Sequence, residues 1–356
     1  MPALLFLPGP YPGAALSARY AAMLTLLFAY AALAQSQLPP KERVFDDWAV
    51  ACDNLKRCEA TALQAPEQFG DEPSQVLLTR DPGPAGALSI AIDPADLVTG
   101  PVTLLIDGKQ VATGTIGENY RVSGQPAEAL AKAMAAGKTL ELRSASRTLA
   151  RISLAGSAAM LRYVDAEQGR AGTVTALVAT GAKPASDVPG AAAAAPIVRA
   201  VRPPVDAAET PTSAVLGELA KLGDCDLSTL ADLPVERYRL DAKTSLVLIP
   251  CGSGAYNFNS AAFVLRGGKG APAEFDTAPD WLEGDGPGIL TNAAFSTTEG
   301  AVLSSFSKGR GIGDCGTSQS WVWDGSRFRM IEARVLNECR GSINWLTVFR
   351  ATPEWH

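Results

Sequence analysis

Histidine is almost absent from this chain. Among 356 residues there is one, His356, and it is the last residue. Catalytic systems that join serine or cysteine to histidine need an imidazole held by packing, and zinc or non-haem iron sites usually take several. A frayed terminal residue supplies neither. We therefore expect no histidine-dependent catalysis, no metal and no cofactor.

An excess of positive charge is also missing. The formal net charge is -6, and removal of a predicted leader makes it -7, because Arg19 is the only charged residue before Lys41. An acidic surface repels phosphate backbones, so we expect no nucleic-acid partner. The hydrophobic fraction of 47% and the charged fraction of 19% are ordinary for a folded chain and exclude global disorder.

A long hydrophobic run occurs only near the start. Arg19 precedes 14 mostly apolar residues, Ala21 to Ala34, which end in Ala-Leu-Ala, the small-x-small pattern that signal peptidase cleaves. A membrane-spanning helix needs about 20 apolar residues. We predict a signal peptide over residues 1–34, a periplasmic location, and no membrane span in the mature chain.

The cysteines have no CxxC spacing, which disfavours a thiolate metal site. Two of the six, Cys52 and Cys58, lie alone in the first half and can close only with each other unless a bridge crosses between the halves. The other four allow three pairings. In the sequential pairing, Cys225 with Cys251 and Cys315 with Cys339, each disulfide would close one strand-turn-strand unit. Each would stabilise the fold by about 3 kcal/mol. These four are Cys225, Cys251, Cys315 and Cys339.

The chain left after the signal peptide, about 322 residues, predicts two domains at about 150 residues each. Residues 180–212 contain six prolines and an alanine run with little apolar periodicity. This composition is typical of a semi-rigid, exposed spacer. We therefore expect domains over residues 41–179 and 213–356.

The first domain alternates strand and helix signals, which predicts an α+β domain with an antiparallel sheet and two helices. Asp107-Gly108 is typical of a hairpin turn. The first helix is expected at 126–136, and the second at 157–168 with Ser157 as its N-cap. The expected strands are 48–52, 76–79, 88–92, 102–106, 140–143 and 149–154.

The second domain opens with a short helix through Val215 and Leu222, and after it strand signals dominate. Asp324-Gly325 is another hairpin signal. This spacing predicts a mainly-β antiparallel meander that closes as a sandwich or as propeller-like blades. The expected strands are 246–249, 261–265, 301–306, 321–323, 328–331 and 345–349.

A set of short motifs runs through both halves. They are Trp48–Asn54 (WAVACDN) with Arg57-Cys58, Ser153–Tyr163 (SLAGSAAMLRY) with Asp165, Gln168 and Arg170, Gly313–Gly316 (GDCG), and Trp321–Gly325 (WVWDG). Together they resemble a bacterial periplasmic family, the domain of unknown function 1176, over nearly the whole mature chain. The first half is also similar to the invasion-associated locus B family. The resemblance implies an exported two-domain protein and brings no catalytic residues.

A GxGxxG pattern at residues 311–316 is the first of three weak catalytic or binding signals. A dinucleotide loop needs a helix after the glycines, whereas a strand is expected here, so a disulfide-tied surface turn is the favoured interpretation. Lys308 and Arg310 beside it could bind an anion. The second signal imitates the three serine acyl-transfer boxes with Ser305-x-x-Lys308, Ser342-x-Asn344 and Lys243-Thr244-Ser245. The basic box comes first instead of last, and the serine lies in a strand pattern instead of at the start of a helix, so we attribute the match to chance.

Carboxylates are the third signal and the remaining route to hydrolysis without histidine. No spacing singles out a pair, and most of these acids are expected to be solvated. Asp224 and Asp226 flank a cysteine but are too few for a calcium cage. The candidates are Asp276, Asp280, Glu283, Asp285, Glu299, Asp314, Asp324, Glu332 and Glu338.

Tryptophan is concentrated in the second half, which holds five of the six. Trp321 and Trp323 are two residues apart on a strand and therefore point to one face. That face either lines the core, which we favour, or forms an aromatic platform for a sugar ring or a protein.

These observations predict an exported, disulfide-bonded binding or envelope-associated protein without intrinsic catalysis. Its partner would be an envelope protein or a glycan. The alternatives are an inhibitor of a cell-wall hydrolase and a carboxylate-dependent glycan hydrolase in the second domain.

Overall fold

The computed structural model describes residues 42–69, 73–96, 98–145, 147–228, 233–281, 286–298 and 300–356. The predicted signal peptide lies outside these ranges. The described residues fall within one compact unit. They are mostly β-structure in several antiparallel sheets, with three α-helices. None of the described helices is long and apolar enough to cross a membrane.

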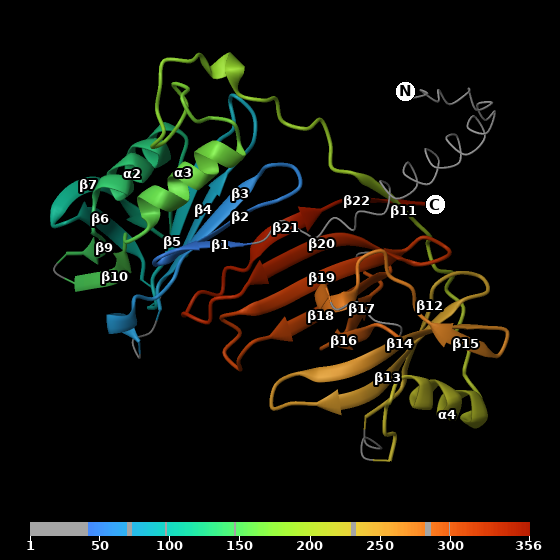
Figure 1. Ribbon diagram of the computed structural model, residues 1–356. Coiled ribbons are helices and arrows are strands. Elements are labelled where there is room, and N and C mark those ends of the chain that lie inside the picture. Colours follow the sequence, from blue (N-terminus) through green and yellow to red (C-terminus); the bar gives the residue numbers. More distant parts are fainter. Residues whose placement is uncertain are drawn as a thin grey trace, which may run out of the picture. The chain divides into compact units, whose positions relative to one another are not determined.

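A six-stranded antiparallel sheet organises the first half (Figure 1). Its strand β2 is apolar on both faces: Trp48 and Val50 enter one hydrophobic cluster, and Ala49 and Ala51 enter another. A strand buried on both faces needs apolar residues in both registers. The strands, in sheet order, are β1 (Arg43–Phe45), β2 (Trp48–Cys52), β3 (Cys58–Ala62), β4 (Gln75–Arg80), β5 (Leu88–Asp93) and β8 (Tyr120–Ser123).

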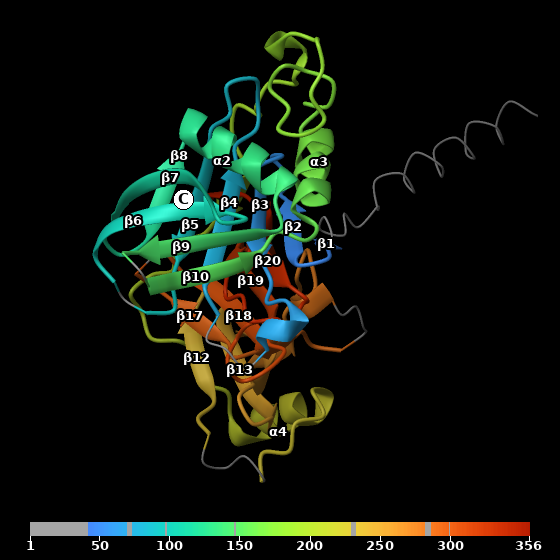
Figure 2. The same ribbon diagram turned by 90° about the vertical axis from the view of Figure 1, so that its left-hand side faces the viewer.

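A four-stranded antiparallel sheet and two helices cover one face of that sheet. Figure 2 shows β9 and β10 running across the strands of the larger sheet. The predicted hairpin at Asp107-Gly108 is confirmed, and both residues have positive φ (50° and 76°). The elements are β10 (Arg147–Ser153), β9 (Thr139–Ser144), β6 (Gly100–Ile106), β7 (Lys109–Ile116), α2 (Gln125–Ala136) and α3 (Ser157–Glu167).

The predicted N-cap of α3 is wrong. Gly156 is the cap residue, with a left-handed φ of 86°, and Ser157 is already helical. A side chain on Gly156 would meet the carbonyl oxygen of Phe45 at 1.8 Å, so this close approach requires glycine. The Ser157 hydroxyl instead donates to the carbonyl oxygen of Met134 (3.0 Å), which ties α3 to the end of α2.

A five-stranded sheet in the second half is apolar on both faces. Helix α4 (Ser213–Leu222) covers one face through Leu219 and Ala220, and Thr212 caps this helix by accepting the N–H of Val215 (3.3 Å). The strands are β12 (Glu236–Arg239), β13 (Ser245–Ser253), β14 (Phe258–Arg266), β15 (Lys269–Pro272) and β16 (Ile289–Thr291).

A second five-stranded antiparallel sheet packs against the other face. Leu246 and Leu248 of β13 share a hydrophobic cluster with Trp321 and Trp323 of this sheet. Such packing corresponds to the sandwich alternative rather than to propeller blades. The strands, in sheet order, are β17 (Ala294–Ser296), β18 (Val302–Lys308), β19 (Gly316–Trp323), β20 (Phe328–Leu336) and β21 (Leu346–Arg350).

The region expected to be a spacer contains regular structure. A short 3-10 helix spans Ala185–Asp187, and β11 (Ile197–Ala200) pairs in parallel with the last strand, β22 (Thr352–Trp355). Val198 and Ala200 are buried against Val322 of β19. This contact covers one end of the outer face of the β17–β21 sheet.

The two halves contact each other through β2, β3 and β21 (Figure 1). Ala49 and Ala51 share a hydrophobic cluster with Leu346 and Val348 of β21. The main-chain N–H of Thr347 donates to a carboxylate oxygen of Glu59 on β3 (2.9 Å). The proposed division at residues 180–212 remains a prediction, because the compact unit includes both halves.

Candidate functional site

A surface groove on the outer face of β18–β20 is the strongest candidate site. Phe306 of β18 is 37% exposed, and its ring stacks on Trp345 with centroids 4.4 Å apart and planes tilted by 10°. The two rings line a cavity of about 550 Å³, a volume within the range of about 300–1,000 Å³ typical of ligand pockets. We call this cavity the aromatic groove; it is defined by Phe306, Lys308, Ile312, Arg334, Ile343 and Trp345.

Two loops form the rim of the aromatic groove and present isoleucines to solvent. Ile312 is 70% exposed and Ile343 is 62% exposed. Side chains of this kind are costly to leave in water, and clustered exposed apolar residues mark interaction sites. The rim is therefore an apolar surface beside a stacked aromatic pair.

The rim loops are held together by covalent and polar contacts. The Cys315–Cys339 disulfide joins their bases. The carboxylate of Asp314 accepts the N–H of Gly341 (2.7 Å), and the indole N–H of Trp345 donates to the carbonyl oxygen of Gly313 (3.0 Å). Such cross-links fix the loops before any ligand arrives, which lowers the entropy lost on binding.

Charged groups line the floor and one end of the groove. Arg334 and Glu332 of β20 form an exposed ion pair (2.7 Å) and so largely neutralise each other. The Lys308 ammonium lies 5.9 Å from the centroid of the Phe306 ring. No ion-pair partner for it occurs among the residues that the structure describes, so within that part of the chain the charge of Lys308 is not neutralised as that of Arg334 is.

The predicted anion-binding residues therefore have different environments. Lys308 lines the groove, whereas Arg310 is paired with Asp314. Burial alone would raise the pKa of Asp314, but hydrogen bonds from Arg310 and the Gly341 N–H lower it below its usual value. Arg310 thus holds the rim loop in shape.

Trp321 and Trp323 lie in the hydrophobic core, the location that the sequence favoured over a surface platform. Trp321 and Trp323 are 0% and 1% exposed. Their indole N–H groups donate to the carbonyl oxygen of Thr277 (3.2 Å) and the carboxylate of Asp241 (2.8 Å). The binding role considered for this pair is corrected to a packing role, because β13 and β14 cover that face of the sheet.

All six cysteines form disulfides, and the pairing is the sequential one. Cys52 pairs with Cys58 between β2 and β3. Cys225, which follows α4, pairs with Cys251 of β13. Disulfides form in oxidising compartments, so their presence is consistent with an exported protein.

Four of the six candidate carboxylates that the structure describes are engaged by arginines. Arg329 binds both Asp276 (2.9 Å) and Asp324 (3.5 Å), Asp314 pairs with Arg310, and Glu332 with Arg334. Glu283, Asp285 and Glu299 lie outside the described residues.

Asp280 differs from these acids because hydroxyl groups surround it. It lies at a left-handed φ of 50° between the two sheets of the second half, and Thr317 donates to its carboxylate. Its main-chain N–H donates to the side-chain oxygen of Gln319 (2.5 Å). Burial raises the pKa of Asp280, against the lowering effect of hydrogen bonds from Thr317 and Thr291.

The serine acyl-transfer pattern does not assemble into a site. Ser305 is 1% exposed. Its hydroxyl accepts the main-chain N–H of Thr291 (2.9 Å) and donates to the carbonyl oxygen of Thr291 (3.1 Å). Lys308 is three residues away on the same strand and therefore lies on the opposite face. The glycine pattern at residues 311–316 leads into strand β19, as expected.

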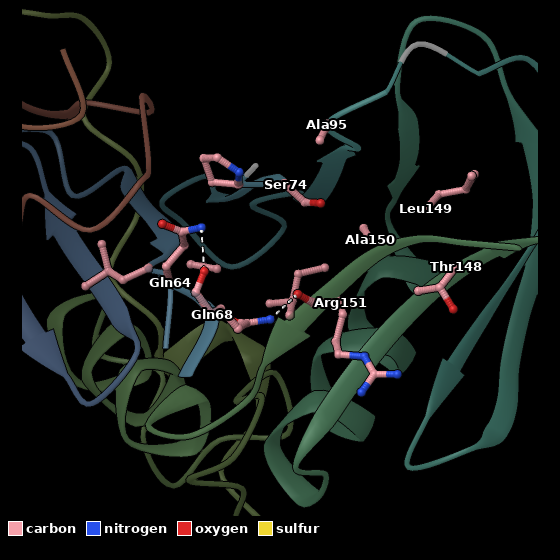
Figure 3. Close-up of a pocket in the computed structure, with 12 residues that line it drawn as sticks. Gln64, Gln68, Ser74, Ala95, Thr148, Leu149, Ala150 and Arg151 are labelled. Carbon is pink, nitrogen blue, oxygen red and sulfur yellow. Dashed lines mark hydrogen bonds between the residues drawn. The ribbon is translucent and has the colours of Figure 1, made fainter. Parts of the chain in front are cut away.

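A second cavity, of about 220 Å³, lies beside β10 (Figure 3). The side-chain amide of Gln68 donates to the carbonyl oxygen of Arg151 (3.0 Å), and Gln64 donates to the carbonyl oxygen of Gln68 (3.3 Å). Gln68 thereby satisfies a carbonyl group on β10, the edge strand of the four-stranded sheet. A carbonyl that is already hydrogen-bonded is less available to pair with a strand of another chain. We assign no ligand to this cavity.

The motif Asp165, Gln168 and Arg170 has a structural role after α3. The buried carboxylate of Asp165 accepts the main-chain N–H groups of residues 177–179 (2.9–3.1 Å). Arg170 donates to the carbonyl oxygen of Gly83 (2.5 Å). Burial, with repulsion from Arg80, lowers the pKa of Arg170 to about 10. These groups fasten the chain after α3 to the loops of the six-stranded sheet.

The stacked pair Phe306 and Trp345 is not among the site residues that the sequence predicts. Both residues fall at one end of an expected strand, 301–306 and 345–349, and nothing in the local pattern relates them. The alternation along β18, with Phe306 and Lys308 on the face opposite Leu303 and Ser305, was the available signal.

Fold and groove together define a disulfide-bonded, mainly-β protein with a stacked aromatic pair in a surface groove. The chain matches the DUF1176 family, described as "Protein of unknown function", over residues 42–352, and it belongs to that family. It is 29% identical over 362 residues to the uncharacterized protein YpfG of Escherichia coli strain K12, across 91% of this chain and 97% of YpfG.

A solved structure with partial similarity is that of invasion associated protein B from Bartonella henselae. The match covers 36% of this chain and 99% of that chain, with 18% identity and a TM-score of 0.28.

Proposed function

We propose that this protein is exported to the periplasm and acts there as a binding protein of the cell envelope, using the aromatic groove. The predicted signal peptide and the three disulfides support export. The observation that carries the proposal is a cavity lined by the stacked pair Phe306 and Trp345 and by two exposed isoleucines on cross-linked loops. Aromatic residues in a rigid, partly desolvated patch are typical anchors of binding surfaces.

Site-specific photo-cross-linking in cells tests this proposal. A benzophenone amino acid is placed at Ile312 or Ile343 on the rim, and at Val205 as an exposed apolar position away from the groove. We expect an adduct from both rim positions and none from the control. The adduct should disappear when Trp345→Ser is added, because one face of the binding surface is lost.

Equal labelling at all three positions, or none at either rim position, would rule out the groove as a binding surface. Periplasmic location is tested in the same cells by osmotic-shock release. Retention of the chain in the cytoplasm with reduced thiols would contradict export.

A further inference from the structure

We propose that the occupant of the aromatic groove is an extended segment of another protein, with an apolar side chain and, two residues further along, an acidic side chain. This inference rests on the proposed binding function and specifies the chemistry that the groove selects. It follows from the apolar rim, the charge of Lys308, which is unpaired among the described residues, and the spacing between the two.

The rim favours an apolar side chain over a sugar ring. Ile312 and Ile343 line the groove together with the stacked rings and are its most exposed hydrophobic residues. Isoleucine cannot hydrogen-bond to the hydroxyl groups that surround a sugar, so burying it against a saccharide would leave those groups unpaired. A leucine, methionine or phenylalanine side chain would bury both isoleucines and the ring face without that penalty.

The charge distribution favours an acidic neighbour of that anchor. Arg334 is matched by Glu332, whereas Lys308 has no carboxylate partner among the described residues. The chain as a whole has a net charge of -6, so a locally positive groove stands out against the rest of the molecule. A carboxylate on the partner would pair with Lys308 and be steered to this end of the groove.

The spacing follows from the register of β18. Phe306 and Lys308 are two residues apart on one face of the strand, where side chains are separated by about 7 Å. The Lys308 ammonium reaches back to 5.9 Å from the Phe306 ring centroid. An extended partner whose apolar and acidic side chains are also two residues apart presents them at the same separation, whereas adjacent residues would point to opposite faces.

Selection from a random peptide library tests the inference directly. Phage that display random 12-residue peptides are selected on the exported full-length protein, and phage that also bind the Ile312→Ser, Trp345→Ser variant are discarded. We expect the retained peptides to share an apolar-x-Asp/Glu pattern. A labelled peptide of this pattern should bind at least about 10-fold more weakly to Lys308→Glu than to the parent protein. Lys269→Glu is the control: it reverses an exposed charge on β15, outside the groove, and should leave binding unchanged.

Charge reversal completes the test. Lys308→Glu should select peptides with Lys or Arg at the acidic position, which a merely damaged groove would not do. A peptide whose acidic residue directly follows the apolar residue should bind the parent protein and Lys308→Glu equally.

Retained peptides without an acidic preference, or no retained peptides at all, would overturn the inference. Groove-dependent binding of chitotetraose, with no peptide binding, would also overturn it but would leave the proposed binding function standing. Absence of rim cross-links in cells together with no binding of either probe would reject both.

Discussion

The hydroxyl oxygens of Thr61 and Ser342 lie 2.7 Å apart in a buried contact between β3 and the rim loop before β21. Thr61 also donates its single hydroxyl proton to the carbonyl oxygen of Val76 (2.7 Å). Ser342 must therefore be the donor to Thr61. The loop that carries Ile343 into the groove is thus hydrogen-bonded to the first half of the chain.

Removal of the Thr61 hydroxyl should destabilise the fold. In Thr61→Val the buried Ser342 hydroxyl loses its acceptor, and an unsatisfied buried donor costs about 1–3 kcal/mol. Urea unfolding of Thr61→Val, Ser342→Ala and the double variant measures the coupling between them. Strictly additive losses would show that the two hydroxyls do not interact.

Arg340 should be a stronger link than Thr61. Its guanidinium binds the carboxylate of Asp47 and the carbonyl oxygens of Asp46 (2.7 Å) and Gln64 (2.7–2.9 Å). Breaking a largely buried pair leaves its partner uncompensated, so Arg340→Ala should lower the free energy of unfolding by about 3 kcal/mol.

The matched control for Arg340 is Arg334→Ala, which breaks an exposed ion pair worth at most about 1 kcal/mol. Both variants are compared by urea denaturation. Equal losses for the two arginines would contradict the assigned role of Arg340.

The Cys315–Cys339 disulfide should stabilise both the fold and the groove. Replacing both cysteines with serine should cost about 3 kcal/mol by the loop-closure argument. It should also weaken cross-linking from Ile312, because the rim loops lose their covalent tie. Replacing Cys225 and Cys251, which close a loop of similar length, should cost a similar amount and leave cross-linking unchanged.

Asp280 should make stability depend on pH. Because burial raises its pKa in the folded protein above the ordinary value of 3.8, its contribution to stability is full below that value and is lost as pH rises through the folded pKa. Asp280→Asn should remove this loss, so the stability of the variant relative to the parent should increase from acidic to neutral pH. Thermal unfolding across this range measures it; a constant difference at all pH values would contradict the assignment.

Local sequence patterns were enough to predict the family and most segments of strand and helix. Alternation at residues 48–52 and the Asp-Gly turns at 107–108 and 324–325 depend on local backbone preferences, so they could be predicted. The number of possible disulfide pairings was reduced because Cys52 and Cys58 lie alone in the first half, although three pairings stayed open for the four cysteines of the second half.

Which strand faces are buried, and where the groove lies, depends on how distant segments of the chain pack together. Period-two alternation places Trp321 and Trp323 on one face but does not say whether that face meets the core, since this depends on β13 and β14 packing there. Phe306 and Trp345 meet because the ring of Trp345, in the loop before β21, packs close to Gly316 of β19 and stacks on Phe306 of the neighbouring strand β18. Contacts of this kind arise from long-range packing, which no local pattern encodes.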